Sequence, residues 1–158
     1  MKQRGRLIGS LLAPVLYGLL STSALGQSPP EDSEVTVTID GLCAFPVLVE
    51  LAGKAKIIEL SGGRAIIISP AFVATFTNLD DPSKQEVLGI TGAFHETTFA
   101  NGDTLFKVTG RNLLIGLDPD NAFVVTVGNF TWVWDEEFNF VQPLTGDGRV
   151  INVCELLE

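Results

Sequence analysis

From Glu34 onward, short stretches of alternating apolar and polar residues are separated by turn residues, and this pattern constrains the fold more than any other feature. The segment EVTVTID places its valines and Ile39 on one side of an extended chain, and PVLVELA repeats the pattern. Two β-branched runs are joined by SGG at 61–63, which predicts a β-hairpin. No stretch of 12 residues after residue 26 keeps a helical period, and only CELLE at 154–158 predicts a short helical turn.

Many short strands joined by tight turns predict an all-β fold with antiparallel pairing. We expect one domain over residues 34–158, an antiparallel β-sandwich of jelly-roll or Greek-key type, with a small closed β-barrel as the alternative. Parallel folds are excluded because parallel strands need long, usually helical, connections. The segments 92–110 and 128–146 align without gaps at glycine, phenylalanine and Thr-Gly positions, which predicts two similar hairpins.

Residues 1–26 have the features of a secretory signal peptide. Three basic residues precede an apolar run over 7–20, and small residues precede the expected cleavage after Gly26. Glycine and proline interrupt the run, which is shorter than the about 20 residues that a membrane-spanning helix needs. We therefore expect a secreted protein in the extracellular space or cell envelope, with no membrane attachment after cleavage. The segment 27–33 is polar and contains two prolines, so we expect it to be disordered.

The mature chain is strongly acidic. All 19 acidic residues but only seven of the ten Lys and Arg residues follow residue 26, so its formal net charge is −12. A field of this sign repels nucleic acid and anionic lipid, and we expect neither as a partner. Carbohydrate and protein are the partners that the composition leaves open.

Acidic turns are the only features that suggest a cofactor. Asp118, Asp120 and Asn121 form the loop best suited to calcium, because Ca²⁺ takes several oxygen ligands. The alternative interpretation is that these are solvated turn residues, and no other cofactor is expected.

The only two cysteines, Cys43 and Cys154, bracket most of the mature chain. In exported proteins such a pair is usually joined, so we expect a disulfide that brings the first and last β-segments side by side. Two unpaired buried thiols are the alternative.

The most distinctive stretch is FTWVWDEEFNF, whose first three aromatic residues share one face of a strand because alternate residues point the same way. With a turn at 135–137, we expect Trp134 opposite Phe138 and Trp132 opposite Phe140. Large aromatic residues are typical of a sheet core. The alternative is a platform on which Trp132 and Trp134 bind carbohydrate or another small ligand.

Residues for catalysis are sparse. His95 is the only histidine and is adjacent to Glu96 in a strand pattern, so the two side chains are expected on opposite faces. No Gly-x-Ser-x-Gly motif and no glycine-rich phosphate loop is present. We therefore expect a non-catalytic binding or accessory protein, with a hydrolase as the remaining alternative.

Four short motifs follow one another along the chain: CAFP from Cys43, TFTN from Thr75, TGRN from Thr109 and INVCELL from Ile151. In this order they resemble a family of small secreted bacterial β-proteins, and the resemblance covers most of the mature chain, from about Cys43 to Leu157. It implies export, one β-domain and cysteines near both ends. It implies no activity, ligand or catalytic residue.

Overall fold

The computed structural model describes residues 28–117 and 122–158 and shows one open antiparallel sheet with sandwich-like packing. In this part of the chain the strands are β1 (Glu31–Ile39), β2 (Val47–Leu60), β3 (Arg64–Ile68), β4 (Val73–Asn78), β5 (Gln85–Gly89), β6 (Gly92–Thr98), β7 (Thr104–Ile115), β8 (Phe123–Trp134) and β9 (Phe140–Asn152), followed by the short helix α2 (Val153–Leu156). The prediction of an all-β antiparallel fold is confirmed. The closed barrel is wrong, because β1, β5 and β9 each pair on one side only.

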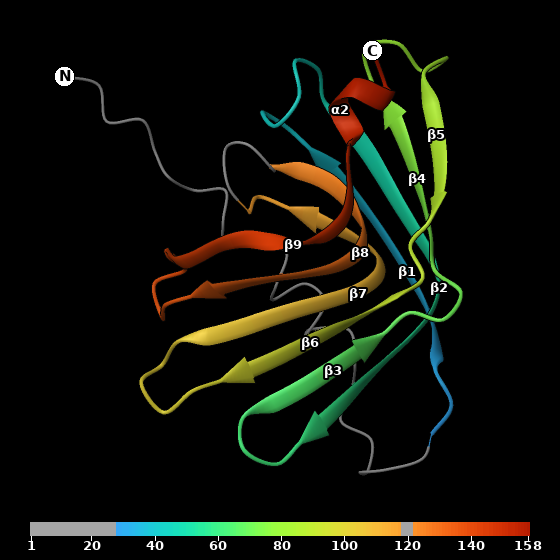
Figure 1. Cartoon of the computed structure of the whole chain (residues 1–158). Coiled ribbons are helices and arrows are strands. Elements are labelled where there is room, and N and C mark those ends of the chain that lie inside the picture. The colour runs from blue at the N-terminus through green and yellow to red at the C-terminus, as the bar shows by residue number, and fades with distance from the viewer. Residues whose placement is uncertain (1–27, 118–121) are drawn as a thin grey trace, which may run out of the picture.

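The strand β2 links the two parts of the sheet. Its first half pairs with β1 on one side and β4 on the other, and its second half pairs with β3. From β3 the sheet continues through β6, β7 and β8 to β9 (Figure 1). The hairpins β6–β7 and β8–β9 are the two that the internal similarity predicts, and residues 61–63 form the expected β2–β3 turn.

The first strand begins earlier than the sequence pattern predicts. Residues 31–33 pair with residues 53–55 of β2, so pairing orders part of the segment 27–33 that was expected to be disordered. The predicted signal peptide, residues 1–26, lies outside the described residues. No helix in the described part of the chain has the length and apolar character needed to cross a membrane.

The start of β8 lies between two cores. Its first four residues, Phe123 to Thr126, expose at most 3% of their surface, although neighbouring residues of a strand point to opposite faces. One side contributes to a first core made of Ile39, Val47, Val49, Ala55, Phe72, Ala74, Phe76, Ile90, Phe123, Val125, Val153 and Leu157. The other side contributes to a second core made of Phe106, Val108, Leu114, Leu117, Val124, Phe130 and Trp132.

A row of glycines crosses the sheet where its strands bend. The register pairs Gly92 with Gly110, Gly110 with Gly128, and Gly128 with Gly148. Gly128 has a φ of 132°, and a Cβ atom there would overlap the backbone carbonyl of Asp147. Figure 1 shows β7, β8 and β9 bending near the middle of their length, where this glycine row lies. Glycine permits such a bend because it tolerates positive φ and close approach of a neighbouring backbone.

The predicted disulfide is confirmed, but the expectation that it brings the first and last β-segments side by side is wrong, because Cys43 lies in the β1–β2 connection, Cys154 lies in α2, and β1 and β9 do not pair. Cys43 and Cys154 are joined, with their Cα atoms 5.3 Å apart and 111 positions apart in the sequence. Both cysteines pack against the first core, of which the fully buried Leu157 is a member. The covalent link therefore holds the last residues of the chain against the β2–β4 part of the sheet.

Two of the motifs on which the family resemblance rests contain a side chain that hydrogen-bonds to another segment of the chain. Asn78 of TFTN is buried, donates through Nδ2 to the carbonyl of Leu157 at 3.2 Å, and accepts through Oδ1 from the backbone N–H groups of Asp80 and Asp81. Arg111 of TGRN, beside the glycine row, donates through Nη1 to the carbonyl of Gly89 at 3.4 Å. These side chains join segments that lie far apart in the sequence.

Candidate functional site

An aromatic cluster covers one face of the sheet formed by β6, β7, β8 and β9. Trp132 stacks on Phe106 with ring centroids 5.1 Å apart and an interplanar angle of 15°. Phe94 meets both rings edge-on, at 5.5 and 5.6 Å. Trp134 extends the cluster toward Phe138 and Phe140 of the β8–β9 hairpin, at 5.9 and 5.8 Å. Trp132 is 1% exposed and is packed as a core residue, whereas Trp134 is half-buried.

The hairpin register differs from the one that the sequence predicts. Phe140 pairs with Trp134 and not with Trp132, because the turn spans 135–139 and the β8–β9 register shifts between Thr131 and Trp134. The turn places Phe138 at a φ of 60° with 56% of its surface exposed. The cross-strand neighbour of Trp132 is Phe106 of β7, a contact that the FTWVWDEEFNF segment alone does not contain.

Two polar atoms of the aromatic cluster have no partner. The indole nitrogens Nε1 of Trp132 and Trp134 are buried and make no hydrogen bond. A buried N–H group that is left unpaired costs about 1–3 kcal/mol, so each such group in a native fold needs an explanation.

Two carboxylates stabilise turns. The Oδ1 atom of Asp81 accepts hydrogen bonds from the hydroxyl and backbone N–H of Ser83, at 2.6 and 3.2 Å, and these bonds lower the pKa of Asp81. Asp135 accepts from the side-chain amide and backbone N–H of Asn139, which lowers the pKa of Asp135 in the same way. Hydrogen bonds to the charged form favour ionisation, so both groups stay ionised and hold their turns.

The sole histidine lies on the face of the sheet opposite the aromatic cluster. His95 pairs with Ile66 and Lys107, whereas Glu96 pairs with Phe106 on the aromatic side, so the expected opposite orientation is confirmed. Within residues 28–117 and 122–158, no three His, Cys, Asp or Glu side chains gather as metal ligands. Asp118, Asp120 and Asn121 lie outside the described residues, and calcium binding there stays a prediction.

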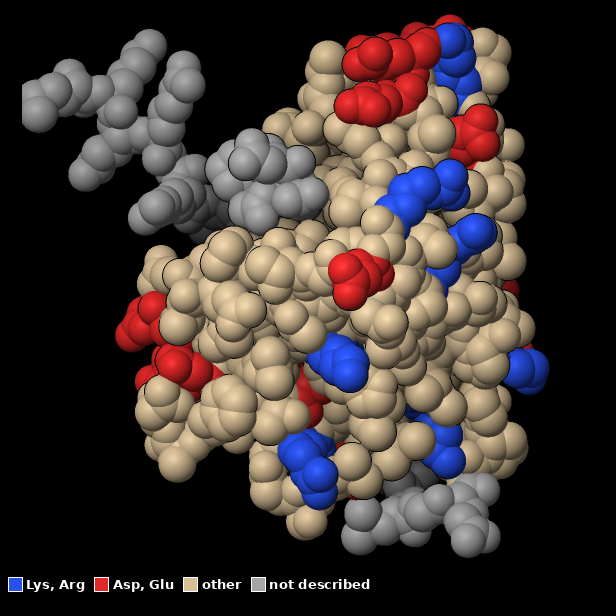
Figure 2. Space-filling model, viewed as in Figure 1, with Lys and Arg blue, Asp and Glu red and all other residues tan. Residues whose placement is uncertain are grey.

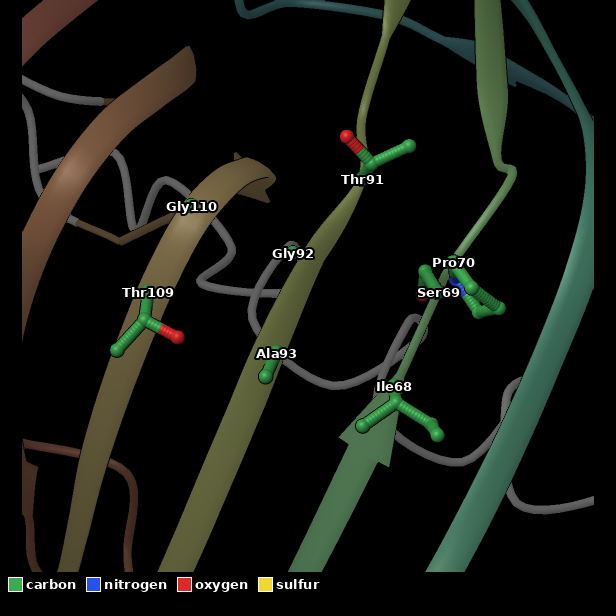
Figure 3. Close-up of a pocket in the computed structure, with 8 residues that line it drawn as sticks. All are labelled: Ile68, Ser69, Pro70, Thr91, Gly92, Ala93, Thr109 and Gly110. Carbon is green, nitrogen blue, oxygen red and sulfur yellow. The ribbon is translucent and has the colours of Figure 1, made fainter.

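A shallow hollow of about 320 Å³ lies on the same face as His95 (Figure 3). It is found where β3 ends and β6 begins, and it extends to β7 at the glycine row. Its lining carries hydroxyl groups but no charge and consists of Ile68, Ser69, Pro70, Thr91, Gly92, Ala93, Thr109 and Gly110. The sequence gives no signal for this hollow, because it arises from strand interruptions that the register brings together.

Asp81 and Asp135 thus hold turns, and the aromatic cluster and the sheet face around the hollow are the candidate ligand surfaces of the described residues. No family model, no curated protein and no solved structure matches this chain.

Proposed function

We propose that this protein is exported and acts outside the cytoplasm as a non-catalytic β-domain that binds a ligand or partner. The observation that carries the proposal is the Cys43–Cys154 disulfide, because such bonds persist in oxidising compartments and are rare in the cytosol. The signal-peptide pattern of residues 1–26 supports the same location.

The positions of the titratable side chains support a non-catalytic role. Asp81 and Asp135 are engaged by hydrogen bonds within their own turns. His95 lies between an isoleucine and a lysine in the strand register, without a serine or carboxylate in the paired positions. A nucleophile–base pair needs two protein side chains within hydrogen-bond reach, and the strand register places no hydroxyl or thiol nucleophile opposite His95.

Export is tested by mass spectrometry of the secreted fraction from cells that express the full chain. We expect a species that begins at Gln27 and is two hydrogen atoms lighter than the dithiol form. The control is a chain that lacks residues 7–20, which should stay inside the cell. A full-length product with two free thiols in the cytoplasm would refute the proposal.

The absence of catalysis is tested by a broad hydrolase screen of the mature protein beside its His95→Ala variant. We expect no turnover by either protein. Turnover that the substitution abolishes would establish the hydrolase alternative.

A second candidate is a small-ligand site at the outer end of the aromatic cluster, which the half-buried Trp134 and the exposed Phe138 favour. Neutral soluble oligosaccharides such as cellohexaose are suitable probes. Binding should shift the tryptophan emission and protect it from acrylamide quenching, with a smaller effect in a Trp134→Phe variant. Blue-shifted emission that resists quenching and does not respond to the probe would assign both tryptophans to the core alone.

A further inference from the structure

We propose that the sheet face opposite the aromatic cluster binds an anionic polysaccharide. This inference rests on the binding function proposed above, for which it names a site and a ligand class. The surface is called the basic face and is defined by five strand residues: Lys56, Arg64, Lys107, Arg111 and Arg149.

The strand register places these five residues on one face. Residues that pair directly across strands share a face. Lys107 of β7 pairs with Thr131 of β8. Two residues further along both strands, Thr109 pairs with Asn129, and Asn129 also pairs with Asp147 of β9. Arg111 and Arg149 both pair with Val127, the next position on this side of β8.

The strand register also places Lys56 of β2 and Arg64 of β3 on the basic face, at its other end. Arg64 of β3 pairs with Thr97 of β6. Thr97 lies two residues from His95, and His95 pairs with Lys107, so Arg64 and Lys107 share a face. Lys56 pairs with Ile68, which pairs with Ala93 of the same β6 face. Arg64, Lys107 and Arg149 are exposed, and Lys56 and Arg111 are half-buried.

The charge of this face is opposite to that of the whole chain. It holds five of the seven Lys and Arg residues of the mature sequence. Among the described residues of β3, β6, β7, β8 and β9, the only carboxylate on this face is Asp147. At the β1–β2 edge, Asp32 lies on the same side and is paired with Lys54. Figure 2 shows this side of the molecule: blue side chains are spread over it, and most of the red ones gather at its top and left edge.

A local basic face can bind an anion although the net charge is −12. Charges in water are screened beyond about 8 Å at physiological ionic strength, so distant carboxylates contribute little at the face. Arg111 and Arg149 are separated by one intervening strand, which corresponds to about 10 Å, and Lys107 is about 13 Å from Arg111 along β7. Cations spaced in this way match the repeated charges of an extended polymer better than one compact anion.

The hollow between these cations suits sugar residues. It includes Ile68, the partner of Lys56, and Thr109, two residues from both Lys107 and Arg111. Its neutral lining offers the hydroxyl groups of Ser69, Thr91 and Thr109, which donate and accept hydrogen bonds as sugar hydroxyls do. Figure 3 shows the side chains of Ile68, Ala93 and Thr109 on three successive strands of this face.

The same face is a poor match for other polyanions. Single-stranded nucleic acid binds by stacking its bases on aromatic side chains, and both tryptophans lie on the opposite face. Peripheral membrane binding uses exposed large apolar side chains. Among the described strand residues, the basic face carries one exposed large apolar residue, Leu60, which pairs with Arg64, whereas the exposed rings of Phe99 and Phe138 lie in hairpin turns.

The test compares two variants with the same change of net charge. Lys107→Gln/Arg149→Gln removes two exposed cations of the basic face. The control Lys54→Gln/Lys84→Gln removes Lys84, which lies outside the face, and Lys54, which lies two residues from Lys56 on the same side of β2 but whose charge is already paired with Asp32. Lys54 forms an ion pair with Asp32 of β1, and Lys84 precedes β5 and contacts the carbonyl of Glu158. The probe is polygalacturonate in affinity electrophoresis and calorimetry with the mature, disulfide-bonded protein, and neutral dextran is the control polymer.

We expect the wild type to bind polygalacturonate at 50 mM NaCl and to release it by 300 mM, because added salt screens the contacts. The basic-face variant should bind about tenfold more weakly, the range expected for loss of two exposed ion pairs. The control variant should bind like the wild type.

Three outcomes would overturn the inference. They are no binding to polygalacturonate at low salt, equal weakening by both variants, and equal or tighter binding to vesicles of anionic phospholipid. Because the measurement uses purified mature protein, its failure would leave the export result intact, and failed export would leave the binding result intact.

Discussion

The two cores of this protein are held together in different ways. The first core is closed by a disulfide and by the buried Asn78, and it contains neither tryptophan. The second core has no covalent link and depends on contacts between aromatic rings, including Trp132. The glycine row lies near the middle of the strands that contribute to both.

The difference indicates two routes to stability within one sheet. A crosslink mainly restricts the unfolded chain, whereas packed aromatic rings stabilise the folded state directly. Because both tryptophans belong to the aromatic cluster, tryptophan emission reports on that region alone, and far-UV circular dichroism reports on the whole sheet. The two regions can therefore be perturbed and observed separately.

Removal of the disulfide should have the largest effect. Cys43→Ser/Cys154→Ser opens a loop of 111 residues and should lower the free energy of unfolding by about 4 kcal/mol. Urea unfolding followed by both signals measures the loss. In hydrogen exchange, the amides of α2 should lose protection before those around Trp132. Equal stability with and without the crosslink would remove the contrast between the cores.

A side chain in the glycine row should disturb both regions together. Gly128→Ala should cost about 3 kcal/mol, because the backbone has positive φ and the added methyl group overlaps the carbonyl of Asp147. Gly89→Ala is the matched control, since a Cβ there meets no atom within 4 Å, and it should change stability by about 0.5 kcal/mol or less. Similar unfolding midpoints for the two variants would show that the bend does not require glycine.

Loss of Asn78 should weaken the first core selectively. Asn78→Ala leaves the carbonyl of Leu157 and two backbone N–H groups without their partner and should cost about 1–3 kcal/mol. Asn101→Ala, in the exposed β6–β7 turn, removes a similar hydrogen bond to Asp103 and should cost about 0.5 kcal/mol or less. If the two costs are equal, burial of the amide has no energetic importance.

A fall in pH should slightly lower the stability of both regions, because each contains one turn that an ionised carboxylate stabilises. Asp81 and Asp135 have pKa values below the usual 3.8 because neighbouring hydrogen bonds favour the carboxylates. Their contribution is therefore fully present above pH 3.8 and is lost as the pH falls through the lower folded values. A thermal-unfolding series from neutral to acidic pH measures this loss. Asp81→Asn/Asp135→Asn should flatten its acidic part, and an unchanged profile would contradict the assignment.

Local patterns predict much of the fold. Period-two alternation predicts the strands, SGG predicts the β2–β3 turn, and the two cysteines in an exported chain predict the crosslink. The partner of Phe140 could not be predicted, because turn length and register shift depend on packing between hairpins. Strand pairing at residues 31–33 also could not be predicted, because the stabilising hydrogen bonds come from β2, and the composition of that segment is typical of disorder.

The candidate surfaces are less predictable than the fold. FTWVW predicts one aromatic face from sequence spacing alone, but Phe94 and Phe106 join it from other strands. The five cations of the basic face are scattered from residue 56 to residue 149 and form no motif. Only the antiparallel register brings them to one side.

The sequence by itself determined the strand-forming stretches, the turns between them and the cysteines available for a crosslink, because each depends on neighbouring residues. The tertiary structure decided how the sheet bends at the glycine row, which aromatic rings meet and where positive charge collects on an acidic chain. These features depend on pairing between residues far apart in the chain. A shift of one residue in that pairing would move every side chain of a strand to the other face.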